Sequence, residues 1–111
     1  MATSPMPRLS ASEYLDLERA AELKSEYLQG KIVAKSGAQL NHSWLSAAVI
    51  EQLGSQLRGK TCGAAGSDTR IHIAAHNVFT YPDVVVICGK PQFADARRDT
   101  IIDATMIVEI L

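Results

Sequence analysis

The apolar run 84–87, within the stretch TYPDVVVICG, is the feature that most limits how this chain can fold. Four consecutive β-branched side chains predict a strand buried on both faces, because such residues pack well on a pleated sheet. Asp83 lies directly before this run and after Pro82, so a carboxylate stands at the start of the most apolar strand. Any account of the chain must explain that position.

Local patterns predict the elements that come first. Ser10 and Glu13 match a capping box, which predicts a helix beginning there. The segment 25–35 contains a short Gln29-Gly30 turn, in which glycine can adopt a positive φ, and it predicts a β-hairpin around that turn. Apolar residues spaced by three and four along 41–60 predict a central helix, with Gly59 as its C-terminal stop.

Strands dominate the second half of the sequence. The segment 70–73 alternates, which predicts a strand with its isoleucines inward and with Arg70 and His72 outward. The segment 104–111 is apolar except for Glu109 and predicts a final strand. Helix, hairpin, helix and several strands indicate an α+β fold, in which helices flank a mixed or antiparallel central sheet.

Length and composition indicate one soluble globular domain. A chain of 111 residues with 47% apolar residues and a net charge of −1 has room for a single core, and we expect one domain over 1–111 with a flexible N-terminus over 1–9. No segment approaches the roughly 20 apolar residues of a membrane span, so we expect no membrane partner and a cytoplasmic location. Cys62 and Cys88 lie far apart without a zinc-ligand spacing, which favours two reduced structural thiols over a disulfide or a zinc site.

Two carboxylates meet if the last strand pairs antiparallel with the strand that follows Asp83. Asp83 then faces Glu109 with Cβ atoms roughly 5 Å apart, close enough to share a divalent cation such as Mg²⁺ or Mn²⁺. Glu109 also interrupts an apolar strand, where an unpaired buried charge would be costly. The alternative interpretation is structural: Asp83 caps a turn and Glu109 pairs with Arg70 or Arg97. Residue pattern alone leaves both open.

The combination of several segments is more specific than either carboxylate. In this order they are KSEYLQGKIV, NHSWLSAAVIEQLGSQLRG, GSDTRIHI, TYPDVVVICG and MIVEIL. Together they resemble the Uma-two family, a branch of the PD-(D/E)xK nuclease superfamily. The resemblance implies a restriction-endonuclease-like fold and a nuclease that uses Mg²⁺ or Mn²⁺ to hydrolyse phosphodiester bonds of nucleic acid. It also implies that Glu26, Asp83 and Glu109 are catalytic, and that Asp83, Glu109 and the Ile110 carbonyl hold the metal. Only the resemblance places Glu26 in the site, since a glutamate on a two-stranded hairpin is usually an exposed residue.

Two further residues have both a functional and a structural interpretation. His42, in the first turn of the central helix, could reach a phosphate or a metal-binding carboxylate, or could be a partly exposed neighbour of the cap. Asp68 is most simply a turn residue, although the resemblance allows it a supporting place behind the metal ligands.

The chain departs from the superfamily pattern at its end. Leu111 stands where the superfamily carries its lysine, two residues after Glu109, and the resemblance implies that a C-terminal part with a substitute lysine is missing. We therefore expect weak turnover or none, since that lysine offsets charge on the phosphate. A non-catalytic relic that serves as an interaction or oligomerisation domain is the alternative. An apolar strand left at the edge also predicts a homodimer.

Overall fold

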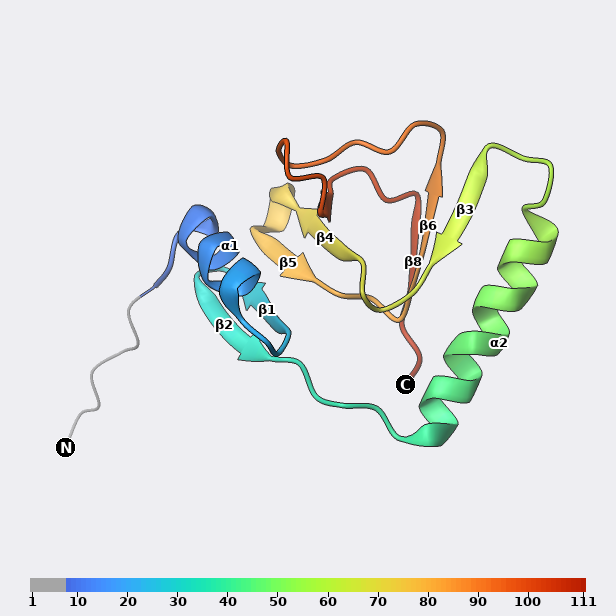
Figure 1. Cartoon of the computed structure of the whole chain (residues 1–111), viewed down its shortest axis with the longest axis horizontal. Coiled ribbons are helices and arrows are strands. Elements are labelled where there is room, and N and C mark those ends of the chain that lie inside the picture. The colour runs from blue at the N-terminus through green and yellow to red at the C-terminus, as the bar shows by residue number, and fades with distance from the viewer. Residues whose placement is uncertain (1–7) are drawn as a thin grey trace.

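The computed structural model describes residues 8–111 (Figure 1). The elements are α1 (Ala11–Ala20), β1 (Ser25–Leu28), β2 (Lys31–Ala34), α2 (Leu40–Gln56), β3 (Cys62–Ala65), β4 (Arg70–Ile73), the 3₁₀ helix η1 (Ala74–His76), β5 (Val78–Thr80), β6 (Val84–Cys88), β7 (Thr100–Ile101) and β8 (Met106–Val108). Of the N-terminus expected to be flexible, residues 1–7 lie outside the described residues. Within the rest, the N–H of Leu9 donates to the carbonyl of Gly30 at 2.9 Å.

The strands form two sheets. The larger has five strands in the order β2-β1-β5-β4-β7, and the smaller has three in the order β3-β6-β8. All pairs are antiparallel except β4 with β7, which is parallel, so the fold is α+β with a mixed sheet, as predicted. The sequence did not predict the division into two sheets.

The predicted capping box starts α1. The N–H of Glu13 donates to Ser10 Oγ at 3.1 Å, and the N–H of Ser10 donates to Glu13 Oε1 at 2.9 Å. These bonds satisfy two of the amide groups that the first turn of a helix leaves without partners. The capping box therefore defines where α1 begins.

An aromatic cluster forms the core beneath α1. Tyr14 of the helix packs against Tyr27 and Phe79, with ring centroids 5.1 and 5.0 Å apart, and all three side chains are buried. His72 stacks on Phe79 with centroids 4.0 Å apart and is half-buried, where the alternation of its strand predicted an outward side chain. The cluster ties α1 to the five-stranded sheet.

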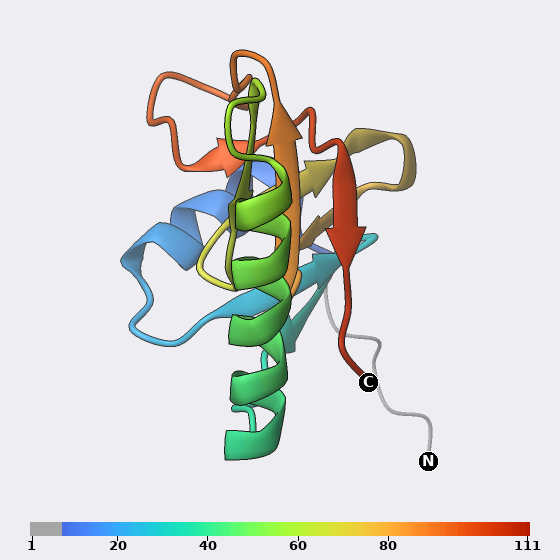
Figure 2. The same ribbon diagram turned by 90° about the vertical axis from the view of Figure 1, so that its right-hand side faces the viewer.

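The long helix α2 packs on the other sheet, against β3 and β6 (Figure 2). Val49 and Leu53 are half-buried, but Trp44 is 66% exposed and Leu45 is 55% exposed. The helix is therefore present where the sequence predicted it, yet its apolar stripe is only partly covered by the described residues.

Arg70 does not point outward, as the alternation of its strand predicted. It is only 7% exposed, and its guanidinium donates to Thr100 Oγ1 at 2.9 Å and to the Tyr81 hydroxyl at 3.1 Å. It also forms an ion pair with Asp99 at 2.9 Å. The reason is β7, which pairs parallel with β4 and brings Thr100 beside Arg70. No sequence pattern predicted β7, which lies in the polar segment between β6 and β8.

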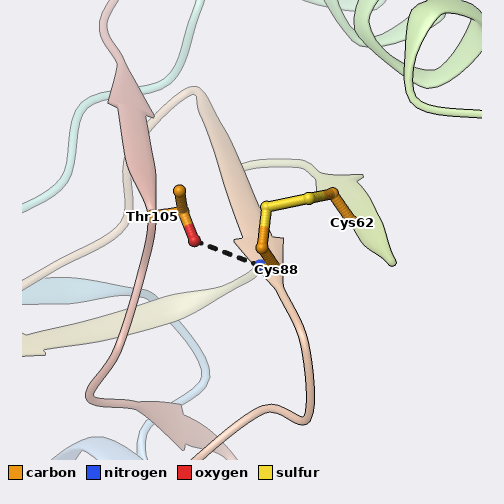
Figure 3. Close-up of a disulfide and its surroundings, with 3 residues drawn as sticks. All are labelled: Cys62, Cys88 and Thr105. Carbon is orange, nitrogen blue, oxygen red and sulfur yellow. Dashed lines mark hydrogen bonds between the residues drawn. A yellow bond between two sulfur atoms is a disulfide. The ribbon is translucent and has the colours of Figure 1, made fainter. Parts of the chain in front are cut away.

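The two cysteines form a disulfide, so the prediction of two reduced thiols is wrong (Figure 3). Cys62 of β3 and Cys88 of β6 are register partners, with Cα atoms 3.9 Å apart. The N–H of Cys88 also donates to Thr105 Oγ1 at 3.1 Å, as Figure 3 shows. The separation of the two cysteines in sequence was misleading because antiparallel pairing places them opposite each other.

Within residues 8–111, no helix is long and apolar enough to cross a membrane.

Candidate active site

The register of the small sheet brings the two predicted carboxylates together. Val84 of β6 pairs with Val108 of β8 in antiparallel register, as predicted. One step further along the two chains, Asp83 therefore stands opposite Glu109. Asp83 is only 8% exposed, whereas Glu109 is exposed, so the expectation of a buried Glu109 is wrong.

Asp83 lies where the chain passes from one sheet to the other. Residues 81–83 are all buried and join β5 of the five-stranded sheet to β6 of the three-stranded sheet. Pro82 fixes its own φ and restricts the residue before it, so this short connection has little freedom. The carboxylate is thus carried by a rigid, covered part of the backbone.

Hydrogen bonds hold one oxygen of Asp83. Its Oδ2 accepts from the N–H of Ile110 at 2.7 Å and lies 3.2 Å from His42 Nε2. His42 Nε2 also lies 3.0 Å from the carbonyl oxygen of Ile110. Since both neighbours are acceptors, we assign the proton to Nε2, which donates. No donor to Oδ1 of Asp83 is present among residues 8–111, so that oxygen is available to a ligand.

Glu26 is held in a similar way from the other sheet. Its Oε2 accepts from the hydroxyl of Thr80 and from the N–H of Tyr81, the latter at 3.3 Å. Oε1 receives no hydrogen bond from the described part of the chain. Each of the two carboxylates is therefore oriented through one oxygen while the other remains available, an arrangement that limits the freedom of both groups.

Glu109 is electrostatically coupled to these groups. Partial burial raises the pKa of its carboxyl, and the negative charge of Asp83 raises it further. The charge of Lys35 and the backbone N–H of Asp83 lower it, and Glu26 adds a smaller upward effect. Three charged side chains, those of Asp83, Lys35 and Glu26, thus act on the Glu109 carboxyl.

The predicted structural alternative for Glu109 is not observed among residues 8–111. No ion pair joins Glu109 to Arg70 or Arg97, because Arg70 pairs with Asp99 instead.

One cavity connects these groups. The residues lining it include Glu26, Lys35, His42, Asp83, Glu109 and Ile110. Figure 1 shows that the segment after β2 runs to the first turn of α2, which lies close to the C-terminal segment, so residues far apart in sequence come near one another. Lys35 is the member that sequence reasoning missed. Its ammonium donates to the carbonyl of Tyr81, and only the three-dimensional position reveals it, because Lys35 belongs to no motif.

Asp68 lies outside this cavity. Its carboxylate pairs with Lys24, which lowers the pKa of Asp68, and its side chain is 95% exposed. The contact is the ordinary surface ion pair of a turn residue. The structure therefore brings together five of the six residues proposed from the sequence and leaves Asp68 apart.

The donors at this cavity are the oxygen atoms that Mg²⁺ and Mn²⁺ prefer. Among residues 8–111, no three His, Cys, Asp or Glu side chains are grouped closely enough to hold an ion by themselves. Mg²⁺ usually binds through one or two carboxylates and keeps several waters. The available oxygen of Asp83, the exposed carboxylate of Glu109 and the Ile110 carbonyl fit that requirement, and they do not fit the nitrogen and sulfur preference of zinc.

Comparison with known proteins identifies the family. Residues 11–111 match the model of the Uma2 (Uma-two) family, described as "Putative restriction endonuclease". The chain therefore belongs to this family, and the resemblance inferred from the sequence is confirmed.

The relatives are longer than this chain. Two proteins of Synechocystis sp. (strain PCC 6803), "Uncharacterized protein sll1609" and "Uncharacterized protein slr1290", are 35% identical over 103 residues and 37% identical over 111 residues. The match covers 93% and 98% of this chain but only 58% and 56% of theirs. The chain thus spans little more than half the length of these relatives.

A crystal structure from Anabaena variabilis ATCC 29413, described as "a putative nuclease belonging to DUF820", has a similar fold. It superposes with a TM-score of 0.62 and 27% sequence identity, over 72% of this chain and 43% of the other. The predicted α+β, nuclease-type architecture is confirmed for the shared part.

Proposed function

We propose that this chain carries the carboxylate site of a metal-dependent nuclease that hydrolyses phosphodiester bonds of nucleic acid. The observation that supports it best is Asp83, which is buried, oriented through Oδ2, available at Oδ1 and paired in register with Glu109. A group that must bind an ion repeatedly in one geometry needs this combination of rigidity and access. Membership of the Uma2 family favours the same reaction class.

Asp83 and Glu109 would hold Mg²⁺ or Mn²⁺, with the Ile110 carbonyl as a further ligand. The ion, when bound, supplies Lewis acidity toward a water molecule and a phosphate oxygen. Glu26 assists from the neighbouring sheet by adding a third negative charge to the cavity. His42 supports the site by donating a hydrogen bond to Asp83, so that the carboxylate keeps its orientation when the ion exchanges.

The test is calorimetric titration of Mn²⁺ into the purified chain, into Asp83→Asn and into Glu109→Gln. We expect binding by the parent and a loss of at least about tenfold in affinity in each variant, since a ligand carboxylate is neutralised. Asp68→Asn is the matched control, because it removes the same charge outside the cavity and should bind like the parent. Absence of Mn²⁺ binding by the parent, or equal binding by all four proteins, would refute the proposed site.

Turnover is measured separately. Plasmid DNA and a structured RNA are incubated with Mg²⁺ or Mn²⁺, with chelated samples and Asp83→Asn as controls. Metal-dependent cleavage that Asp83→Asn abolishes would establish the activity for this chain.

A second candidate function is a non-catalytic interaction or oligomerisation domain with a nuclease fold. Leu111 at the position of the superfamily lysine favours it, as do the exposed apolar side chains of α2, among them Trp44. This candidate predicts no cleavage and no Mn²⁺ binding, together with a stable oligomer. Light scattering on the eluting protein measures the oligomer directly, and a monomer would exclude self-association as the function.

A further inference from the structure

The candidate site carries an excess of negative charge, which opposes the binding of a phosphodiester. Glu26, Asp83 and Glu109 place three negative groups around one cavity, and a phosphodiester brings another negative charge. A divalent ion offsets part of this charge, and a lysine or arginine beside the phosphate is a common way to stabilise the charge that remains.

Lys35 is held in the same cavity by two hydrogen bonds. Its backbone N–H donates to the carbonyl of Lys24 at 3.0 Å, which extends the β1–β2 ladder by one residue. Its ammonium donates to the carbonyl of Tyr81, two residues before Asp83. The side chain is half-buried. The ammonium is therefore held by the backbone in the cavity that Asp83 also lines.

The ammonium of Lys35 retains capacity for a ligand. A lysine has three N–H donors, and the bond to Tyr81 uses one of them. No carboxylate of residues 8–111 forms an ion pair with it at 4.0 Å or less. Lys24, which lines the same cavity, differs because Asp68 and the carbonyl of Ser67 already accept from its ammonium. Of these two lysines, only Lys35 lacks a partner of opposite charge.

We propose that Lys35 binds a non-bridging phosphate oxygen of a nucleic acid at this site, and so supplies a positive side chain for the proposed hydrolysis. The proposal rests on the proposed nuclease function and names a catalytic residue for it. Two free donors on a half-buried ammonium favour a charge-assisted hydrogen bond, which is about twice as strong as a neutral one. Lysine suits this task as a compact point charge.

The test measures nucleic-acid binding and needs no turnover. Fluorescence anisotropy follows labelled short DNA and RNA oligonucleotides, single- and double-stranded, with Ca²⁺ as the added ion. We expect Lys35→Gln to weaken binding about tenfold and to reduce the salt dependence by about one phosphate contact. Lys35→Arg should keep most of the affinity, because it keeps the charge. Comparison of the DNA and RNA arms tells which source of phosphodiester the site prefers.

Lys31→Gln is the matched control. It removes the lysine that begins β2, four residues before Lys35, which is exposed and does not line the cavity, and it should bind like the parent. Thermal melts accompany each variant. If Lys35→Gln melts below the assay temperature, Lys35→Met, which keeps the apolar stem of the side chain, replaces it.

Two results would overturn the inference: equal oligonucleotide affinity for the parent and Lys35→Gln, or no binding by the parent in any arm. Mn²⁺ calorimetry on the same samples separates this failure from failure of the proposed function. Lys35→Gln should bind Mn²⁺ at least as tightly as the parent, since a repelling charge has gone. Mn²⁺ binding without any effect of Lys35 on oligonucleotides leaves the metal site standing and removes Lys35 from it.

Discussion

His42 Nε2 lies 3.2 Å from Asp83 Oδ2 and 3.0 Å from the carbonyl oxygen of Ile110, so one side chain from α2 contacts both strands' flanking residues at one end of the β6–β8 pair. The N–H of Ile110 in turn donates to the same oxygen of Asp83. The helix, the start of β6 and the segment after β8 are thus joined at a single carboxylate. Loss of any one of the three contacts should weaken the other two.

We expect His42→Ala to weaken Mn²⁺ binding by about tenfold, because the orienting partner of Asp83, the carboxylate that we propose as a metal ligand, is lost. Stability should fall by about 1 kcal/mol, the typical contribution of one hydrogen bond. Calorimetry and urea unfolding measure the two effects. His76→Ala, at an exposed position of η1, is the control. Unchanged Mn²⁺ affinity in His42→Ala would show that His42 does not support the site.

Reduction of the Cys62–Cys88 disulfide should destabilise the chain by about 3 kcal/mol, as expected for closing a loop of this length. The two cysteines are 26 residues apart in sequence, and the loop between them contains β4 and β5. Urea unfolding with and without a phosphine reductant measures the difference. The double substitution of both cysteines by serine should behave like the reduced parent and should itself be insensitive to the reductant. Identical midpoints for the oxidised and reduced parent would contradict this expectation.

Asp99 should make stability depend on acid pH. Hydrogen bonding from Arg19 holds the pKa of Asp99 well below its usual range, and the charge of Arg70 contributes in the same direction. A lowered folded-state pKa stabilises the fold above the unfolded pKa of about 3.9, and this stabilisation is lost as pH falls toward the folded value. Asp99→Asn should therefore cost about 1 kcal/mol at neutral pH, since the carboxylate is partly exposed, and the cost should shrink below about pH 4.

Chemical unfolding across that range checks the prediction. Asp16→Asn, at an exposed position of α1 with no ion pair among residues 8–111, controls for the removal of one charge. A difference between Asp99→Asn and the parent that stays constant from neutral to acid pH would assign the effect to something other than ionisation.

The outer edge of β8 should allow two copies to pair. β8 is the last strand of its sheet in the described part of the chain, and Met106 and Ile107 are exposed on it. We expect the chain to form a homodimer through this edge, because an unpaired apolar edge strand is a template for another strand. Ile107→Lys should give a monomer, and light scattering measures the mass. The interpretation fails if the parent is already a monomer, or if Ile107→Lys leaves a dimer intact.

Local patterns predicted the elements that position the site. The start of α1, the hairpin and the strand β6 depend mainly on residues close together in sequence: a capping box, a turn glycine and a run of four apolar side chains. Such elements can therefore be predicted without knowledge of the fold. The antiparallel pairing of β6 with β8 was a hypothesis from two apolar runs, and the register of the small sheet confirms it. The juxtaposition of Asp83 and Glu109 depended on that hypothesis.

The features that sequence reasoning missed depend on distant partners. β3 consists of cysteine, glycine and alanine, which have little preference for strands, so its pairing with β6 and the disulfide went unseen. β7 has two residues and exists only because β4 lies beside it, which also explains the burial of Arg70. Lys35 carries no local signal, and its place beside Tyr81 is decided by where the segment between β2 and α2 runs.

The connection 81–83 has a mechanical consequence. Glu26 belongs to the five-stranded sheet, whereas Asp83 and Glu109 flank strands of the three-stranded one. The spacing between these carboxylates therefore depends on how the two sheets are set against each other, and the short, buried connection through Pro82 fixes that placement locally. A substitution deep in either sheet that shifts it would change the geometry of the candidate site without altering any residue proposed to bind the ion.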